Sequence, residues 1–183
     1  MFIGHVGVGF GAKRAAPGAS LGVLVAAPLL LDLLWPLPSN PDSASFRYTH
    51  SLLTAGLAGI VFGVVYWAIT RYSRGAIVIS LGVVSHWILD TVAHPPDLPL
   101  IPCGTMRVGL GLQNSAPGII AAEVLTFGIG VFLYLSSTRH LDRIGRFAMW
   151  GLLPVVVISA PFPPALWLFP LLAWWIDRHR RMA

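Results

Sequence analysis

Three side chains that could bind a metal ion follow one another at four-residue intervals near the end of an apolar segment. They are His86, Asp90 and His94. Four residues turn an α-helix by about 400°, so the three side chains lie along one stripe in steps of ~6 Å. Imidazole and carboxylate can share a metal ion, and ionisable groups inside an apolar helix usually mark a site. The ends of the stripe are ~12 Å apart, too far for one ion, so either Asp90 bridges two ions or His94 contacts substrate or supports a ligand.

The composition indicates a membrane setting for these residues. Only 10% of the 183 residues are charged and 56% are hydrophobic, and the mean hydropathy is +0.76. A soluble domain carries about 25% charged residues, so the composition predicts an all-α membrane bundle formed by one domain, residues 1–183. The single cysteine, Cys103, excludes a disulfide within the chain and a thiolate metal cluster. The basic residues are spread between apolar segments, and we expect no nucleic-acid partner.

Six apolar runs follow a short N-terminal segment. Four of them are long enough to cross a bilayer: Ala15–Leu37, Leu52–Ile69, Ala76–Val92 and Pro117–Leu135. Two shorter runs, Phe147–Ala160 and Ala165–Ile176, are joined by a proline cluster and predict a short helical hairpin over residues 147–177. The glycine-rich run Phe2–Ala12 is too short to span and suits close helix packing. The sequence therefore predicts about six spans plus an N-terminal half-helix, with the metal site in residues 1–130.

The basic residues predict an orientation. With six crossings, ten of the twelve fall on one side: Lys13, Arg14, Arg71, Arg74, Arg139, Arg143, Arg146, Arg178, Arg180 and Arg181. The positive-inside rule makes this side cytoplasmic, with both termini inside a multi-pass cell (inner) membrane. Only Arg47 and Arg107 fall on the other side, where they either contact lipid headgroups or bind an acid or a substrate phosphate.

Polar side chains from four helices reach similar depths when counted from these basic residues. At 1.5 Å per residue the heights are ~18 Å for His86, ~24 Å for Asp90 and Glu123, ~27 Å for Asp32 and ~31 Å for His50. These heights lie in the outer half of a hydrocarbon layer ~30 Å thick. Counted from Lys13, His5 reaches only ~12 Å, unless a tilted or re-entrant segment lifts it. We expect the metal ligands to be His5, Asp32, His50, His86 and Asp90, with Asp90 also catalytic and Glu123 a further ligand or the general base.

Each of these side chains also has a purely structural interpretation. Asp90 could accept a hydrogen bond from a neighbouring helix, and Asp32 could extend to the outer interface. Thr49 or Ser51 could cap the helix that begins next to His50. The stretch Pro95–Ala116, rich in proline and glycine, is predicted to cover the site. Two further histidines, His140 and His179, lie among arginines and are predicted to be surface residues.

The order of the motifs resembles a known family. The elements are His5 followed by glycines, a late Asp32, Arg47-x-x-His50-Ser51 and Ser85-His86-x3-Asp90. Over residues 1–130 they are similar to the YdjM-like predicted membrane-bound metal-dependent hydrolases. The resemblance implies a metal-dependent hydrolase in a bacterial or archaeal membrane. The family often has two nearby acids where this chain has Asp32 alone.

A weaker likeness extends to soluble enzymes. The order His5, Asp32, His50, His86, Asp90, Glu123 is similar to that of zinc-dependent phospholipases C and P1-type nucleases, which are helical hydrolases that cut phosphodiesters with a cluster of zinc ions. That family has a histidine four residues before the glutamate, where this chain has Ile119. The departure argues against a full three-metal cluster.

These patterns together predict a membrane hydrolase for an ester or phosphoester substrate, plausibly a lipid, at the outer face. Arg47, Arg107 and His94 would bind the substrate. Imidazole and carboxylate ligands favour Zn²⁺, with Mn²⁺ or Fe²⁺ as alternatives, and the metal would activate water. A transporter or a proton or cation pathway is the first alternative, and a non-catalytic membrane scaffold is the second. Membrane lipids are expected partners, whereas the number of ions and the oligomeric state do not follow from the sequence.

Overall fold

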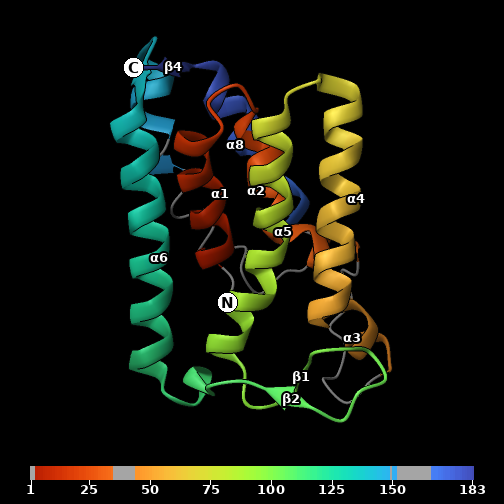
Figure 1. Cartoon of the computed structure of the whole chain (residues 1–183). Coiled ribbons are helices and arrows are strands. Elements are labelled where there is room, and N and C mark those ends of the chain that lie inside the picture. Colours follow the sequence, from red (N-terminus) through yellow and green to blue (C-terminus); the bar gives the residue numbers. More distant parts are fainter. Residues whose placement is uncertain (1–2, 35–43, 149, 152–165) are drawn as a thin grey trace.

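Three long helices form the frame of the molecule. The computed structural model describes residues 3–34, 44–148, 150–151 and 166–183. Within this part of the chain, three helices are long and apolar enough to cross a membrane: α4 (Leu52–Thr70), α5 (Ser73–Ala93) and α6 (Ala116–Ser137). They extend from one end of the molecule to the other (Figure 1). These helices confirm the prediction of a helical membrane protein. The predicted number of six spans is not confirmed.

A pair of shorter helices enters this frame from one end. Helices α1 (Ile3–Ala15) and α2 (Leu21–Leu34) have 13 and 14 residues, which gives lengths of ~20 Å against a hydrocarbon layer of ~30 Å. The chain reverses between them over residues 16–20. The first residues of α1 lie near mid-height of the molecule (Figure 1). The predicted run Ala15–Leu37 is therefore interrupted by this turn, and its last residues lie outside the described part of the chain.

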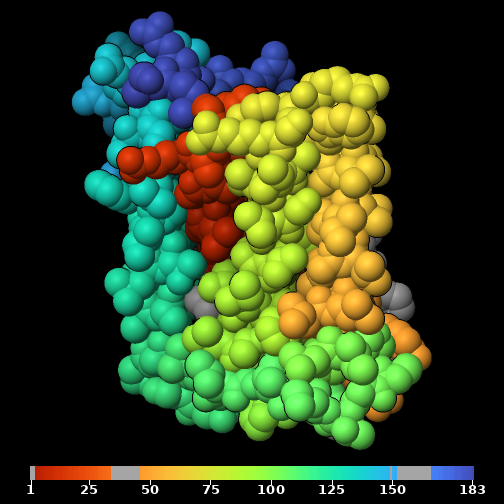
Figure 2. All heavy atoms as spheres, viewed as in Figure 1, coloured from red at the N-terminus to blue at the C-terminus, as the bar shows by residue number. Residues whose placement is uncertain are grey.

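Glycines let α1 pack tightly between its neighbours. A Cβ atom on Gly7 would lie 2.5 Å from Cα of Phe127 on α6, and one on Gly130 would overlap the carbonyl oxygen of Gly7. Small residues at such positions allow two helix backbones to approach closely. Figure 2 shows α1 between α5 and α6, visible only in one half of this face. Helices α4 and α5 use the same device, since a Cβ on Gly59 would lie 2.7 Å from the carbonyl oxygen of Ser80.

Short elements close both ends of the bundle. At the end where α5 finishes lie α3 (Ala44–Thr49), η1 (Leu112–Asn114) and an antiparallel pair, β1 (Leu98–Pro99) with β2 (Arg107–Val108). At the other end β3 (Thr138–His140) pairs antiparallel with β4 (Arg180–Met182). The prediction of an all-α protein omitted both pairs, because strands of two or three residues leave no periodic signal.

The C-terminal part is described only in places. Residues 143–148 are helical, and α8 (Leu168–Arg178) packs against α2. The predicted hairpin over residues 147–177 falls mainly on residues outside the described part of the chain, including the proline cluster. Within the described residues, the second half of the predicted hairpin corresponds to α8, so this half is a helix as predicted.

Two apolar clusters share α2. One cluster joins α1, α2, α6 and α8 through residues such as Phe10, Leu29 and Phe169. The other joins α2 to α4 and α5 through residues such as Leu24 and Ile79. The outer faces of α4 and α6 expose large apolar side chains instead, as expected for helices that contact lipid tails. The short hairpin is therefore held by buried apolar contacts on two sides.

The segments that carry the basic residues lie at two ends of the molecule. The turn after α1, the α4–α5 turn, and strands β3 and β4 lie at one end of the molecule (Figure 1), here called the arginine-rich end. Arg47 on α3 and Arg107 on β2 belong to the opposite end.

Candidate metal centre

Five side chains from four separate segments meet inside the bundle. His5 comes from α1, Asp32 from α2, His50 from the junction of α3 and α4, and His86 and Asp90 from α5. The possible ligand atoms form two groups, and within each group all atoms lie within 4.8 Å of one another. Both groups contain His86: the first is His5, Asp32 and His86, and the second is His50, His86 and Asp90. The structure thus brings together all five residues that the sequence analysis proposed as ligands. We call these five residues the His–Asp cluster.

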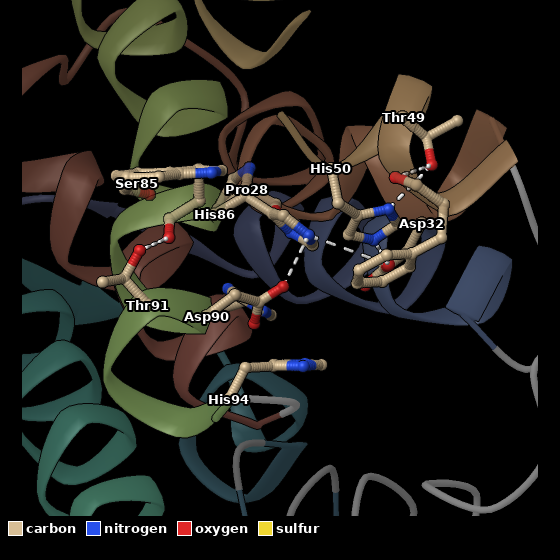
Figure 3. A network of polar contacts seen from close by, with 12 residues as sticks. Pro28, Asp32, Thr49, His50, Ser85, His86, Asp90, Thr91 and His94 are labelled. Carbon is tan, nitrogen blue, oxygen red and sulfur yellow. Dashed lines mark hydrogen bonds and ion pairs between the residues drawn. The ribbon is translucent and has the colours of Figure 1, made fainter. Parts of the chain in front are cut away.

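Imidazoles and carboxylates alternate through the cluster. Nε2 of His5 lies 3.2 Å from Oδ1 of Asp90, and Nε2 of His86 lies 3.1 Å from Oδ2 of Asp90. On the other side, Oδ1 of Asp32 lies 3.8 Å from Nε2 of His86 and 3.3 Å from Nε2 of His50. Figure 3 shows the side chains of Asp32, His50, His86 and Asp90 pointing toward one another.

The orientation of His86 is set by α2. Its Nδ1 lies 2.8 Å from the carbonyl oxygen of Pro28. A carbonyl oxygen can only accept, so Nδ1 carries a proton and Nε2 of the neutral ring presents its lone pair. Nε2 is buried without a hydrogen bond, although two carboxylates flank it. A lone pair directed at carboxylate oxygens is repulsive unless a proton or a cation lies between them.

His50 shows the same arrangement. Nδ1 of His50 lies 2.7 Å from the hydroxyl of Thr49, and this hydroxyl donates to the carbonyl oxygen of Phe46 at 3.3 Å. When the hydroxyl donates to Phe46, its oxygen accepts the Nδ1 proton and the Nε2 lone pair faces Asp32; in the other tautomer Nε2 donates to Oδ1 of Asp32 at 3.3 Å and Nδ1 accepts from Thr49. A metal ion on Nε2 would select the first tautomer. The ring of Phe46 stacks on His50 at 4.5 Å between centroids. A hydrogen bond from the second ring nitrogen is typical of histidines that bind metals.

The side chains of the cluster differ in exposure. The side chains of His5 and His86 are 1% exposed, and their rings stack at 4.3 Å between centroids. The side chain of Asp32 is 28% exposed. Asp32 is therefore the most exposed side chain of the cluster.

His94 lies one turn beyond Asp90, at the end of α5. Its ring extends from α5 on the same side as the Asp90 carboxylate (Figure 3). Nδ1 of His94 and Oδ1 of Asp97 are 3.4 Å apart, and neither buried atom has a hydrogen bond. The covering loop is fixed to the end of α5 by hydrogen bonds from the Leu110 amide to the Thr91 carbonyl and from the Gly111 amide to the His94 carbonyl. The predicted cover, Pro95–Ala116, thus lies over the end of α5 that carries the cluster.

Other residues proposed from the sequence lie elsewhere. Glu123 belongs to neither group of possible ligands, and its Oε2 accepts the backbone N–H of Gly4 at 2.6 Å. Arg107 donates to the carbonyl oxygen of Asp97 at 2.8 Å and so braces the loop. Arg47 lies on α3, next to the Phe46 ring that packs on His50.

The sequence analysis missed Pro28 and assigned Thr49 differently. Ser51 caps α4 by accepting the Thr54 amide, so of the two alternatives, Thr49 and Ser51, the second is the cap. Thr49 instead orients His50. A threonine adjacent to a histidine and a proline inside an apolar helix are the available signals, and neither is specific.

The geometry of the cluster fits a divalent metal. Bonds of 2.0–2.2 Å in a tetrahedral site place neighbouring ligand atoms about 3.4 Å apart. The separations between neighbouring imidazole nitrogens and carboxylate oxygens run from 3.1 to 3.8 Å. Both groups contain His86, whose Nε2 has one lone pair, so His86 could bind an ion in only one of the two groups at a time.

Fold and cluster together define a helical membrane protein with a buried His–Asp cluster beside a short helical hairpin. Comparisons with protein-family models, with curated proteins and with solved structures find no match for this chain.

Proposed function

We propose that this protein is a membrane-embedded metal-dependent hydrolase. The observation that carries the proposal is Nε2 of His86, which is buried between two carboxylates while Nδ1 donates to Pro28. A divalent cation in that position accepts the lone pair and offsets the charge of Asp32 and Asp90. The resemblance to the YdjM-like hydrolases supports the same assignment.

The residues have distinct roles in this proposal. His5, Asp32, His50, His86 and Asp90 hold the ion, which is Zn²⁺, with Mn²⁺ or Fe²⁺ as alternatives because five donors exceed the three that a catalytic zinc needs. Held by these residues, a divalent ion would supply Lewis-acid chemistry, which lowers the pKa of bound water and polarises a carbonyl or phosphoryl oxygen. Pro28 and Thr49 keep the ligand nitrogens oriented. His94, one turn beyond Asp90, contacts the substrate.

The substrate is an ester or phosphoester, and a lipid fits best. The cluster is inside a membrane protein, and its most exposed side chain is that of Asp32. The covering loop next to the cluster lies at the end of the molecule opposite the arginine-rich end. By the positive-inside rule, the arginine-rich end faces the cytoplasm of a cell (inner) membrane. The covering loop then lies at the outer face. Arg47 and Arg107 lie at that same end and are placed to meet a headgroup.

The test is hydrolysis by purified protein in lipid micelles. Chromogenic carboxylate esters and phosphodiesters should be cleaved, a chelator should abolish the activity, and added Zn²⁺, Mn²⁺ or Fe²⁺ should restore it. His86→Ala should be inactive, while His179→Ala at the arginine-rich end should match the wild type. Metal-loaded wild type without any turnover on either class would contradict the hydrolase.

A second function follows from the same alternation of groups. The sequence of contacts from His5 through Asp90, His86 and Asp32 to His50 is continuous, and such chains can relay protons across membrane proteins. Metal-independent proton flux in reconstituted vesicles, lost in Asp90→Asn, would favour this function over hydrolysis.

A further inference from the structure

Glu123 is an ionisable residue inside a membrane helix that the His–Asp cluster does not use. Such residues are costly in lipid and require a compensating role. Its Oε2 accepts the Gly4 backbone N–H at 2.6 Å. Gly4 lies in the first turn of α1, which begins at Ile3.

The first turn of α1 has an unusual need for an acceptor. The first four N–H groups of any helix have no partner within the helix. Most helices expose these groups to water, but α1 begins near mid-height of a membrane protein (Figure 1). A backbone donor without a partner costs several kcal/mol in that setting. A carboxylate is the strongest available acceptor and is also favoured by the helix dipole.

The face of α6 that carries Glu123 is the face that packs on α1. Glu123, Phe127, Gly130 and Tyr134 follow one another in steps of four, three and four residues, so they lie on one side of the helix. The rings of Phe127 and Tyr134 contact Phe10 of α1 edge to face, with centroids 6.3 and 5.3 Å apart. Glu123 is thus the end of a continuous α1–α6 contact.

The residue that makes this hydrogen bond, Gly4, is adjacent in sequence to a member of the His–Asp cluster. His5 follows Gly4 directly, and its Nε2 meets Asp90 while its ring stacks on His86. The covalent link means that whatever fixes the amide of Gly4 also fixes the depth and rotation of the His5 imidazole.

We propose that Glu123 is a positioning residue, neither base nor ligand, which caps the membrane-buried start of α1 and thereby holds His5 in the metal site. This inference rests on the metal site proposed above. It replaces the general-base and ligand roles expected from the sequence, and it explains why an acid persists inside α6.

The test measures the affinity of purified protein for Zn²⁺ and uses three substitutions of one residue. Glu123→Leu removes the acceptor and should weaken binding about 10-fold or more, as for other partners that orient a ligand. Glu123→Gln keeps an amide oxygen for the Gly4 N–H and should stay within about threefold of wild type. Glu123→Asp keeps the charge but is one methylene too short, so it should behave like the leucine variant.

A double-mutant cycle separates positioning from a general loss of structure. In the His5→Ala background, Glu123→Leu should change the Zn²⁺ affinity by less than about twofold, because the group it positions is already gone. The visible spectrum of bound Co²⁺ should be alike in Glu123→Leu and His5→Ala. Thr126→Val is the matched control, since its hydroxyl donates within α6 to the Ala122 carbonyl, and it should bind as the wild type does.

Three outcomes would overturn the inference. Equal losses from Glu123→Leu with and without His5 would show that Glu123 does not act through His5. Loss in Glu123→Gln equal to that in Glu123→Leu, with Glu123→Asp retained, would make the carboxylate a ligand. Wild-type metal affinity in both Glu123→Leu and Glu123→Asp would remove any role. If Glu123→Leu does not fold, the contrast between the Gln and Asp variants carries the test. A wild-type protein that binds no metal would instead contradict the proposed function.

Discussion

Two polar clusters lie inside this bundle, and they differ in how completely protein groups satisfy them. Near the arginine-rich end, Asp177 accepts from the Lys13 ammonium at 2.7 Å and from the Leu21 amide at 3.1 Å, and the Tyr134 hydroxyl donates to it at 3.4 Å. Lys13 also donates to the Ala19 carbonyl oxygen. These contacts join the α1–α2 turn to α6 and α8, and we call them the Asp177 clamp.

The His–Asp cluster is different. Among the described residues, the buried side-chain polar atoms without a hydrogen bond all belong to this cluster or to the His94–Asp97 pair next to it. They are Nδ1 of His5, Nε2 of His86, Nδ1 of His94 and Oδ1 of Asp97. Native proteins rarely leave such atoms unpaired without a function. The comparison teaches that protein groups complete the Asp177 clamp as a structural element, whereas the His–Asp cluster keeps polar atoms that have no hydrogen bond from the described residues.

The largest expected effect concerns the His–Asp cluster. His86→Ala removes the imidazole shared by both groups of ligands, so metal affinity should fall by more than the roughly 10–100-fold that loss of an outer partner costs. Isothermal titration with Zn²⁺ measures it, with His140→Ala as the control. Unchanged affinity would mean that the two clusters do not differ as described.

Breaking the Asp177 clamp should lower the stability of the protein and leave its metal affinity nearly unchanged. Asp177→Ala leaves the Lys13 ammonium buried without its carboxylate, which should lower the free energy of unfolding by about 3 kcal/mol. The folded fraction should still bind metal with nearly wild-type affinity. Thermal denaturation in detergent and Zn²⁺ titration measure the two quantities, and a large loss of affinity at intact stability would contradict the division of roles.

A smaller effect should come from the partner of His50. Thr49→Val removes the oxygen that accepts the Nδ1 proton, and Zn²⁺ affinity should fall about 10-fold. Thr49→Ser keeps the hydroxyl and should bind as the wild type does. Equal affinities for the Val and Ser variants would exclude an orienting role for the hydroxyl.

The smallest effect lies on the surface. The Gly145 amide and the His179 ring hold the pKa of Asp142 below its ordinary value. The folded state thus favours the ionised form, and the resulting stability is present above the ordinary carboxyl pKa and lost as the pH falls through the lowered pKa. Asp142→Asn should therefore reduce stability slightly at neutral pH and less in acid, without affecting Zn²⁺ affinity. A difference in melting temperature that grows toward low pH would contradict the sign.

Long apolar runs made part of the fold predictable. Helices α4, α5 and α6 match the predicted runs closely because uninterrupted apolar segments of that length have few alternatives in a membrane. The start of α2 was less predictable, because the turn at residues 16–20 lies inside a region that is apolar on both sides. Hydropathy does not register a reversal there.

The position of a residue along its helix was predictable, whereas the face of the helix on which it lies was not. Counting along each helix placed Asp32, His86 and Asp90 at similar heights, and the structure brings them together. The same count placed Glu123 at that height, but height carries no information about which face of α6 the residue occupies. The same count placed His5 at a smaller height than the other residues, yet the structure brings its ring next to Asp90 and His86.

Elemental analysis of purified protein tests the central claim most directly. The wild type should carry a divalent metal in near-stoichiometric amount that survives dialysis, and so should the His140→Ala, His179→Ala variant. The His86→Ala, Asp90→Ala double variant should carry none while remaining folded. Stoichiometric metal retained in that double variant, or a wild type that never binds metal, would contradict the account.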